Sequence, residues 1–242
     1  MSAPATAVVA YTVRACASGR RLVLLLPLVG TVLFGLLSRL SEQPAADAFA
    51  RVGGAAVHTL VLPIACLVIG DAVLGAEVRS GTFAFTWLSP VSWSTIVVGR
   101  WLGGWLVAIA LLAPAVAVGA LMAGAPGSVP AAVVAAAAGS AAYLAVFVAV
   151  GATFARPVVW SLVLVVLVER LLGAALDAVA QVSPGWLAQS VLVGLTETTG
   201  GLRRDGVPLG GGAVGRLALV TVVGLVIATR RLRRLRPASA VE

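Results

Sequence analysis

Six apolar stretches, separated by short polar or basic segments, make up most of the chain. Each is close to the length of about 20 residues that a helix needs to cross the hydrocarbon core of a bilayer. The pattern predicts an all-α integral membrane protein, a six-helix transmembrane bundle in which residues 1–242 form a single domain. The expected spans are residues 22–38, 54–74, 100–124, 129–154, 158–176 and 211–229.

Two segments outside the spans have a mixed character. Residues 1–21 read as an amphipathic lead-in before the first span, and residues 177–210 combine polar and apolar positions. The lead-in and first span resemble a secretory signal, but the apolar stretch is long for a signal and more spans follow it, so we expect it to be retained. Residues 177–210 are expected to form short helices on the outer face.

The composition excludes a soluble domain. The chain is 60% hydrophobic and 11% charged, which leaves too few polar groups to cover a water-exposed surface. The net charge of +8 is the balance of 17 basic residues against nine acidic ones. All the basic residues are arginines, and these lie beside apolar segments and in a terminal run. That placement is typical of topology determinants facing anionic lipid, so we expect membrane lipids as partners and no nucleic acid.

The arginines also predict an orientation. With both termini inside, eleven arginines lie in cytoplasmic segments and four in outer ones. Because basic residues favour the cytoplasmic side, we expect a multi-pass protein of the bacterial inner (plasma) membrane with both termini in the cytoplasm.

The segment between the second and third spans carries the most information. It reads GAEVRSGTFAFTWLSPVSWSTIVVGRWLGG over residues 75–104. Ser80 or Thr82 can start a short helix that ends before Pro90, and Ser92 can cap the third span. Phe83 and Trp87, four residues apart, share one face of that helix. This apolar face can lie among lipid headgroups or enter a groove on a soluble partner.

Residues 75–82, 88–92 and 96–100 resemble the cytoplasmic loop of type-2 ABC exporter permeases, and the order of spans is also similar. In that family an acidic residue is followed by Gly-Thr, then by Leu-Ser-Pro-Val-Ser, then by a span. The resemblance implies a half-transporter that forms a homodimer or a heterodimer with a related permease. It also implies that the short helix is a coupling helix docked on a separate ABC ATPase subunit, and that the lead-in is a connecting helix along the membrane.

Several residues carry this implied docking role. Five of them match the family pattern directly, and one departure is Trp93, where the family often has a basic residue. The predicted docking residues are Glu77, Arg79, Gly81, Thr82, Phe83, Trp87, Leu88, Ser89 and Pro90. ATP and Mg²⁺ would be bound by the partner ATPase, with no cofactor in this chain.

Two acidic residues within the spans are candidates for a translocation path. Asp71 lies near the inner end of the second span, where it can also reach the interface by extending along the helix. Glu169 lies about 18 Å into the fifth span, a depth at which ionisable groups face a bundle interior or water. Glu169 can line a path, or the fifth span can break near it.

Absent motifs limit the possible chemistry. A Walker A loop needs a lysine, and the chain has none, so it brings no P-loop ATPase of its own. One histidine, His58, and two cysteines exclude the common zinc motifs, and no nucleophile motif marks a catalytic serine. We therefore expect no enzyme. The alternative function is an ion-coupled secondary transporter or channel that uses Asp71, His58 or Glu169; an intramembrane enzyme using His58 is the weakest reading.

Overall fold

The computed structural model describes residues 3–18, 26–75, 91–154, 156–196, 198 and 206–234. Every element within these ranges is helical. Five of the described helices are long and apolar enough to cross a membrane, as expected for a multi-pass membrane protein. They cover Ala45–Val73, Trp93–Met122, Pro126–Gly151, Pro157–Ala175 and Gly211–Arg234.

The first predicted span is described only in part. Helix α2 covers Leu26–Ser38, which is 13 residues, and residues 19–25 lie outside the described ranges. Other boundaries differ too, most of all at three places: the second span begins at Ala45 rather than residue 54, the third begins at Trp93 rather than residue 100, and the last ends at Arg234 rather than residue 229. The second and third spans begin in a partly polar stretch that precedes their apolar residues, and hydropathy alone does not identify such a stretch as helical.

Local signals define the ends of helix α7 (Trp93–Met122). Ser92 is its N-cap, and the side-chain oxygen of Ser92 accepts a hydrogen bond from the Thr95 backbone at 3.2 Å, as predicted. At the other end Gly124 takes φ +78°, and the Ala125 N–H bonds back to the Ala120 carbonyl at 3.0 Å. This is a Schellman ending, which turns the chain through η5 (Pro126–Ser128) into α8 (Val129–Gly151).

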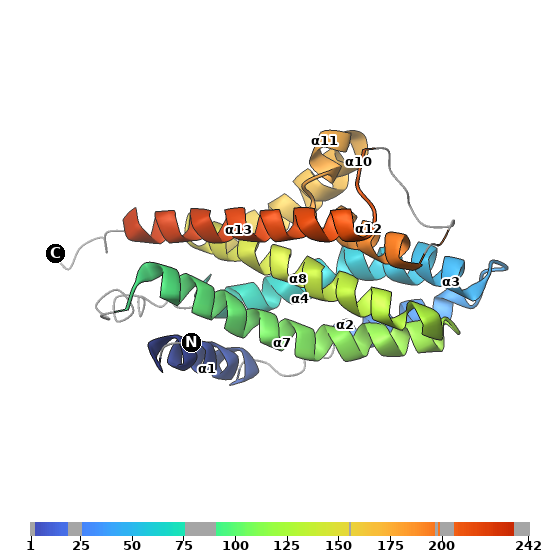
Figure 1. The fold of residues 1–242 in the computed structure, drawn as a ribbon, viewed down its shortest axis with the longest axis horizontal. Helices are drawn as coiled ribbons and strands as arrows, with labels where there is room; N and C mark the ends of the chain where they lie inside the picture. Colours follow the sequence, from blue (N-terminus) through green and yellow to red (C-terminus); the bar gives the residue numbers. More distant parts are fainter. Residues whose placement is uncertain are drawn as a thin grey trace.

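Helix α8 is the central helix of the bundle (Figure 1) and packs against α7, α4 (Leu62–Gly70), α12 (Pro184–Thr196) and α13 (Gly211–Arg234). Its residues Tyr143 and Leu144 are fully buried. Small residues let neighbouring helices approach closely, as is common in membranes. A Cβ at Gly224 of α13 would lie 2.9 Å from the Ala145 carbonyl carbon of α8.

The second span is a composite helix. It runs through α3 (Ala45–Ala48), η2 (Phe49–Gly54), η3 (Val57–Val61), α4 and η4 (Asp71–Gly75), and the three η segments are π-helical. The fifth span also contains a π-helical segment: α9 (Pro157–Val163) leads into η6 (Leu164–Leu172) and α10 (Gly173–Ala175). π-Helical turns are rare and are frequently found at functional sites.

Between the fifth and last spans lie α11 (Asp177–Ala180) and α12. The short helices expected here are present, and their position on the outer face stays a prediction. Helix α12 lies inside the bundle. Its residues Leu187, Ala188, Val191 and Leu192 are fully buried among α8, α13 and the second span. The α10–α11 segment, by contrast, projects from the bundle (Figure 1).

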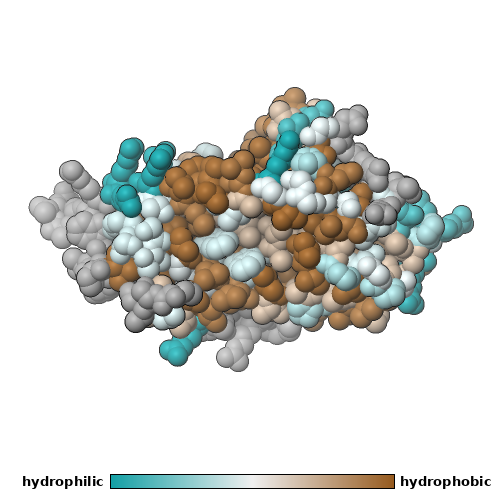
Figure 2. Space-filling view, viewed as in Figure 1, coloured by the Kyte–Doolittle hydropathy of each residue, from teal (hydrophilic) through white to brown (hydrophobic). Residues whose placement is uncertain are grey.

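The two ends of the bundle differ. At one end lie helix α1 (Ala3–Ser18), the start of α7 and the end of α13 with Arg230–Arg234 (Figure 1). Helix α1 packs on the first half of α7, where Gly99 and Gly103 face Val8 and Thr12. Apolar side chains cover much of the middle of the visible face, and hydrophilic ones gather mainly toward its ends (Figure 2). Both ends of the described chain, residues 3 and 234, therefore lie in the same half of the molecule.

Candidate functional site

The structure describes no contacts of the predicted docking residues. Residues 76–90 lie outside the described ranges, and that segment holds Glu77, Arg79, Gly81, Thr82, Phe83, Trp87, Leu88, Ser89 and Pro90. What the structure describes is the pair of helices that hold this segment at both sides.

Those two helices are joined by a buried arginine. Arg100, on the second turn of α7, is 4% exposed and its Nη1 donates to the Val73 carbonyl of η4 at 2.9 Å. The guanidinium therefore satisfies a carbonyl at the end of the second span, where a helix leaves such groups without partners. With Ser92 capping α7, the two sides of the 76–90 segment are fixed beside each other.

Glu169 is the second part of the candidate site. It lies in η6 and is 2% exposed. Its Oε2 accepts a hydrogen bond from the Tyr143 hydroxyl at 2.6 Å, and its Oε1 accepts from the Ser183 hydroxyl and from the Gly185 backbone N–H at 2.7 Å. Three elements, α8, η6 and the start of α12, therefore meet at one carboxyl group, which we call the Glu169 junction.

The Glu169 junction caps a buried helix. Helix α12 begins at Pro184, and the N–H groups of its first turn have no partner within the helix. Glu169 accepts one of them, from Gly185, and Ser183 accepts from Trp186 at 3.5 Å. An acidic group at a helix N-terminus is also favoured by the helix dipole. The contacts of Glu169 thus anchor α12 to the fifth span and to α8.

Gly185 leaves the space that this arrangement needs. A Cβ at that position would lie 2.5 Å from Glu169 Oε1, 2.7 Å from the Tyr143 hydroxyl and 3.1 Å from Arg170 Nη2. No real side chain fits there without moving these groups. Glycine therefore leaves room for the hydrogen-bonded side chains as they stand.

Arg170 and His58 lie next to this junction. Arg170 Nη2 donates to the His58 backbone carbonyl at 3.4 Å, and His58, 1% exposed in η3, donates from Nδ1 to the Gly54 carbonyl at 2.6 Å. Within the described part of the chain, His58 Nε2 and Arg170 Nε are buried without a hydrogen-bond partner. No nucleophile with a paired base is seen among these contacts.

Asp71 is not part of the same cluster. It lies in η4 and lines a small hollow with Phe147, Pro157 and Ser161, near the end of the bundle where α9 begins. Glu169 lies eight residues beyond Ser161 along the fifth span. The two predicted path residues are therefore held at different places along the bundle, and the hydrogen-bond partners of Glu169, which are Tyr143, Ser183 and Gly185, lie inside it.

Sequence reasoning identified Glu169 but missed its partners. Tyr143 sits in an otherwise apolar stretch, and Ser183 and Gly185 follow Glu169 by 14 and 16 residues across two turns. The available signal was Ser183-Pro184, because a serine followed by proline is typical of a helix start. Among the described residues, no three His, Cys, Asp or Glu side chains come together as metal ligands.

Comparison with known proteins adds no identification: no protein-family model matches the chain, and no curated protein sequence matches it.

Proposed function

We propose that this chain is the membrane permease subunit of an ATP-driven exporter of the type-2 ABC class. The observation that carries the proposal is the segment 75–92, in which Glu77, Gly81, Thr82, Ser89 and Pro90 stand at the spacing of that family's cytoplasmic loop. The segment lies between the second and third spans, the position that the resemblance requires.

The helices around the segment support this reading. Its two sides, η4 and α7, are tied by the Arg100–Val73 hydrogen bond. The described residues on its two sides also lie toward the end of the bundle where α13 carries Arg230, Arg231, Arg233 and Arg234 (Figure 1). An arginine-rich end is the one expected in the cytoplasm, where an ATPase subunit would be found.

In the proposed mechanism, the short helix of residues 80–88 docks on a partner ATPase that binds ATP and Mg²⁺. Closure of the ATPase pair moves this helix, and the tie between η4 and α7 passes the movement to the second and third spans. Two permease chains, identical or related, form the path in the plasma membrane. Such coupling requires the partner to bind the two states of the bundle with different affinity.

The alternative of ion coupling at Glu169 receives less support. A carboxyl group that accepts three hydrogen bonds from α8 and α12 is suited to holding elements together. That arrangement favours a role in anchoring helices over a role in ion coupling, in which the carboxyl group would repeatedly bind and release an ion or a proton.

The test is co-purification with a P-loop ATPase encoded beside this chain. The chain is tagged, both proteins are co-expressed, and retained ATPase is measured for wild type and for Glu77→Ala/Trp87→Ala. A matched control is Glu42→Ala/Leu40→Ala, which also removes one acidic and one large apolar side chain. Both control residues are exposed, Leu40 at 81%, in the turn after α2 at the other end of the bundle.

Wild type and the control pair are expected to retain the ATPase, and the Glu77/Trp87 pair to lose most of it while eluting as a monodisperse protein. Equal retention by both pairs would remove the docking role of residues 75–92. A wild type that retains no ATPase would remove the exporter proposal itself.

A further inference from the structure

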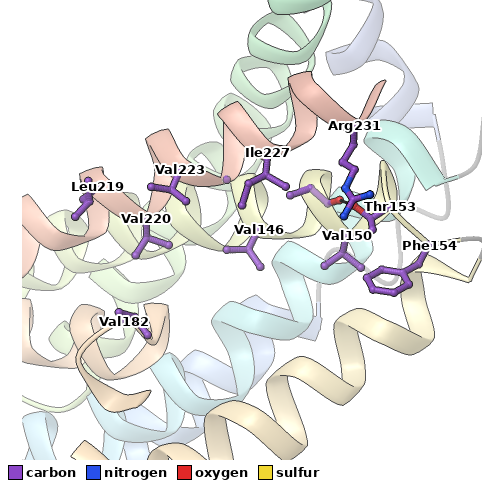
Figure 3. A pocket seen from close by; sticks show the side chains of 12 residues that line it. Val146, Val150, Thr153, Phe154, Val182, Leu219, Val220, Val223, Ile227 and Arg231 are labelled. Atoms are coloured by element: carbon purple, nitrogen blue, oxygen red, sulfur yellow. Dashed lines mark hydrogen bonds between the residues drawn. The ribbon is translucent and has the colours of Figure 1, made fainter. Parts of the chain in front are cut away.

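Two apolar grooves flank helix α13. The larger, of about 500 Å³, lies between α13 and α8 and is lined by Val146 and Val150 of α8 and by Val220 and Val223 of α13, among others (Figure 3). The smaller, of about 360 Å³, lies on the other side of α13, against Ser94 and Val98 of α7. Volumes in this range are typical of sites for small molecules.

The wall of the larger groove follows a four-residue repeat. Leu219, Val223, Ile227 and Arg231 occur at successive intervals of four along α13, and all four line the groove. Residues four apart lie on one face of a helix, so the apolar stripe ends on an arginine. In Figure 3 the Arg231 side chain extends from α13 across the end of the groove toward Thr153.

The smaller groove repeats this design. Its lining from α13 includes Val222, Val226 and Arg230, again at intervals of four, and Leu225, Thr229 and Arg233 in a parallel row. Both grooves are therefore apolar along their length and end on guanidinium groups at the same end of the bundle.

Among the residues that the structure describes, these guanidinium groups have no acidic partner. Arg230, Arg231 and Arg233 are exposed, and within the described ranges none of them forms an ion pair or a side-chain hydrogen bond. A guanidinium donates in a fixed fork that matches carboxylate and phosphate groups. The charge at the end of each groove thus calls for an anion joined to an apolar chain.

We propose that each groove binds one anionic phospholipid, with an acyl chain along the apolar stripe and the headgroup phosphate on Arg231 in the larger groove or on Arg230 and Arg233 in the smaller. Basic sites between spans at the cytoplasmic side suit such headgroups. A second copy of this chain is a poorer occupant, because a two-fold contact between parallel bundles would place Arg231 beside Arg231. This inference does not depend on the exporter proposal.

The test is native mass spectrometry of the full chain in detergent, titrated with phosphatidylglycerol or with phosphatidylcholine of the same acyl chains. Wild type is expected to retain two phosphatidylglycerol molecules per chain and to bind phosphatidylcholine about tenfold more weakly. Arg231→Gln should retain one, and Arg230→Gln/Arg233→Gln should also retain one. The matched control is Arg234→Gln, which removes the same charge from the same helix end at a residue that lines neither groove.

A second variant keeps every charge. Val223→Trp fills the larger groove and should also reduce retention to one lipid, whereas Leu171→Trp, at a 59% exposed position outside both grooves, should not. Equal loss in Arg231→Gln and Arg234→Gln would overturn the site in favour of general charge attraction. Equal binding of the two lipids would overturn it as well. So would Val223→Cys protein that forms disulfide-linked dimers and retains no lipid, because a second copy of the chain would then occupy the groove.

Discussion

The hydroxyl of Tyr143, at the centre of α8, donates a 2.6 Å hydrogen bond to Oε2 of Glu169 in the fifth span. Ser183 and Gly185 donate to the other oxygen of the same carboxyl group. One acidic side chain inside the bundle is therefore fully engaged by neighbours from two other elements. These contacts lead us to expect that Glu169 anchors neighbouring helices rather than coupling transport to an ion.

Substitution of Glu169 separates these two roles. Glu169→Gln keeps one oxygen for Gly185, and its amide can donate to Tyr143 once the phenol hydroxyl turns, so the junction survives with a small loss of stability. Glu169→Ala leaves three buried donors without a partner and should lower the unfolding free energy by about 3 kcal/mol or more. Thermal unfolding in detergent measures both effects.

Transport activity completes that comparison. If Glu169 only anchors α12, Glu169→Gln transports at a rate close to wild type. Loss of transport in a Glu169→Gln protein with normal thermal stability would show instead that the acidic group itself takes part in transport, as the ion-coupled alternative requires.

Tyr143→Phe removes one hydrogen-bond donor to Glu169 alone and is expected to lower the unfolding free energy by about 1–3 kcal/mol.

The space at Gly185 gives a second prediction. Gly185→Ala places a methyl group 2.5 Å from Glu169 Oε1 and 2.7 Å from the Tyr143 hydroxyl, so these buried, hydrogen-bonded side chains have to shift and the cap on α12 is weakened. We expect a loss of about 2 kcal/mol or more, of the size seen for lost caps and overpacking. The measurement is the melting temperature in detergent.

The matched control is Gly215→Ala in α13, where a Cβ would meet nothing within 4 Å. Alanine is favoured over glycine in a helix by up to about 1 kcal/mol, so this variant should be as stable as wild type or slightly more stable. A Gly185→Ala protein that melts with the control would mean that the junction can rearrange at little cost.

The packing of α1 gives a third prediction. Cys16, 5% exposed, lies outside the five long spans, and its burial raises the pKa of its thiol to about 11. The reactive thiolate is therefore scarce at pH 8, and labelling by a water-soluble maleimide should be slow. Cys66, the other thiol, is fully buried in α4. Tyr11→Cys, at a 54% exposed position on the same helix, should label about tenfold faster or more.

The pH dependence has a definite sign. The neutral thiol is the form favoured when α1 is packed. The contribution of Cys16 to the stability of this packing is therefore complete below the ordinary thiol pKa near 9 and is lost as pH rises toward 11. Cys16 labelling should therefore stay slow at pH 7–8 and rise steeply above pH 9. Rapid labelling of Cys16 at pH 7 would show that α1 does not stay packed on α7.

The sequence predicts long elements better than contacts between them. The cap at Ser92 is confirmed because it depends on residues close together in the sequence. The buried position of α12 does not follow from its own residues, since polar residues such as Gln189 and Ser190 interrupt its apolar face. The partners of Glu169 come from α8 and α12, and a pattern along one helix carries no information about them. The docking residues 77–90 remain predictions.

The glycine contacts of the bundle limit how it can move. At Gly224 the backbone of α13 touches that of α8, and at Gly35 and Gly119 the backbone of α2 touches that of α7. At these points the helices lie so close that a side chain in place of glycine would collide with the facing backbone. These approaches hold α8 against α13 and α2 against α7, so we expect a change of shape to leave both contacts in place and to involve the fifth span, the least buried of the five long described helices.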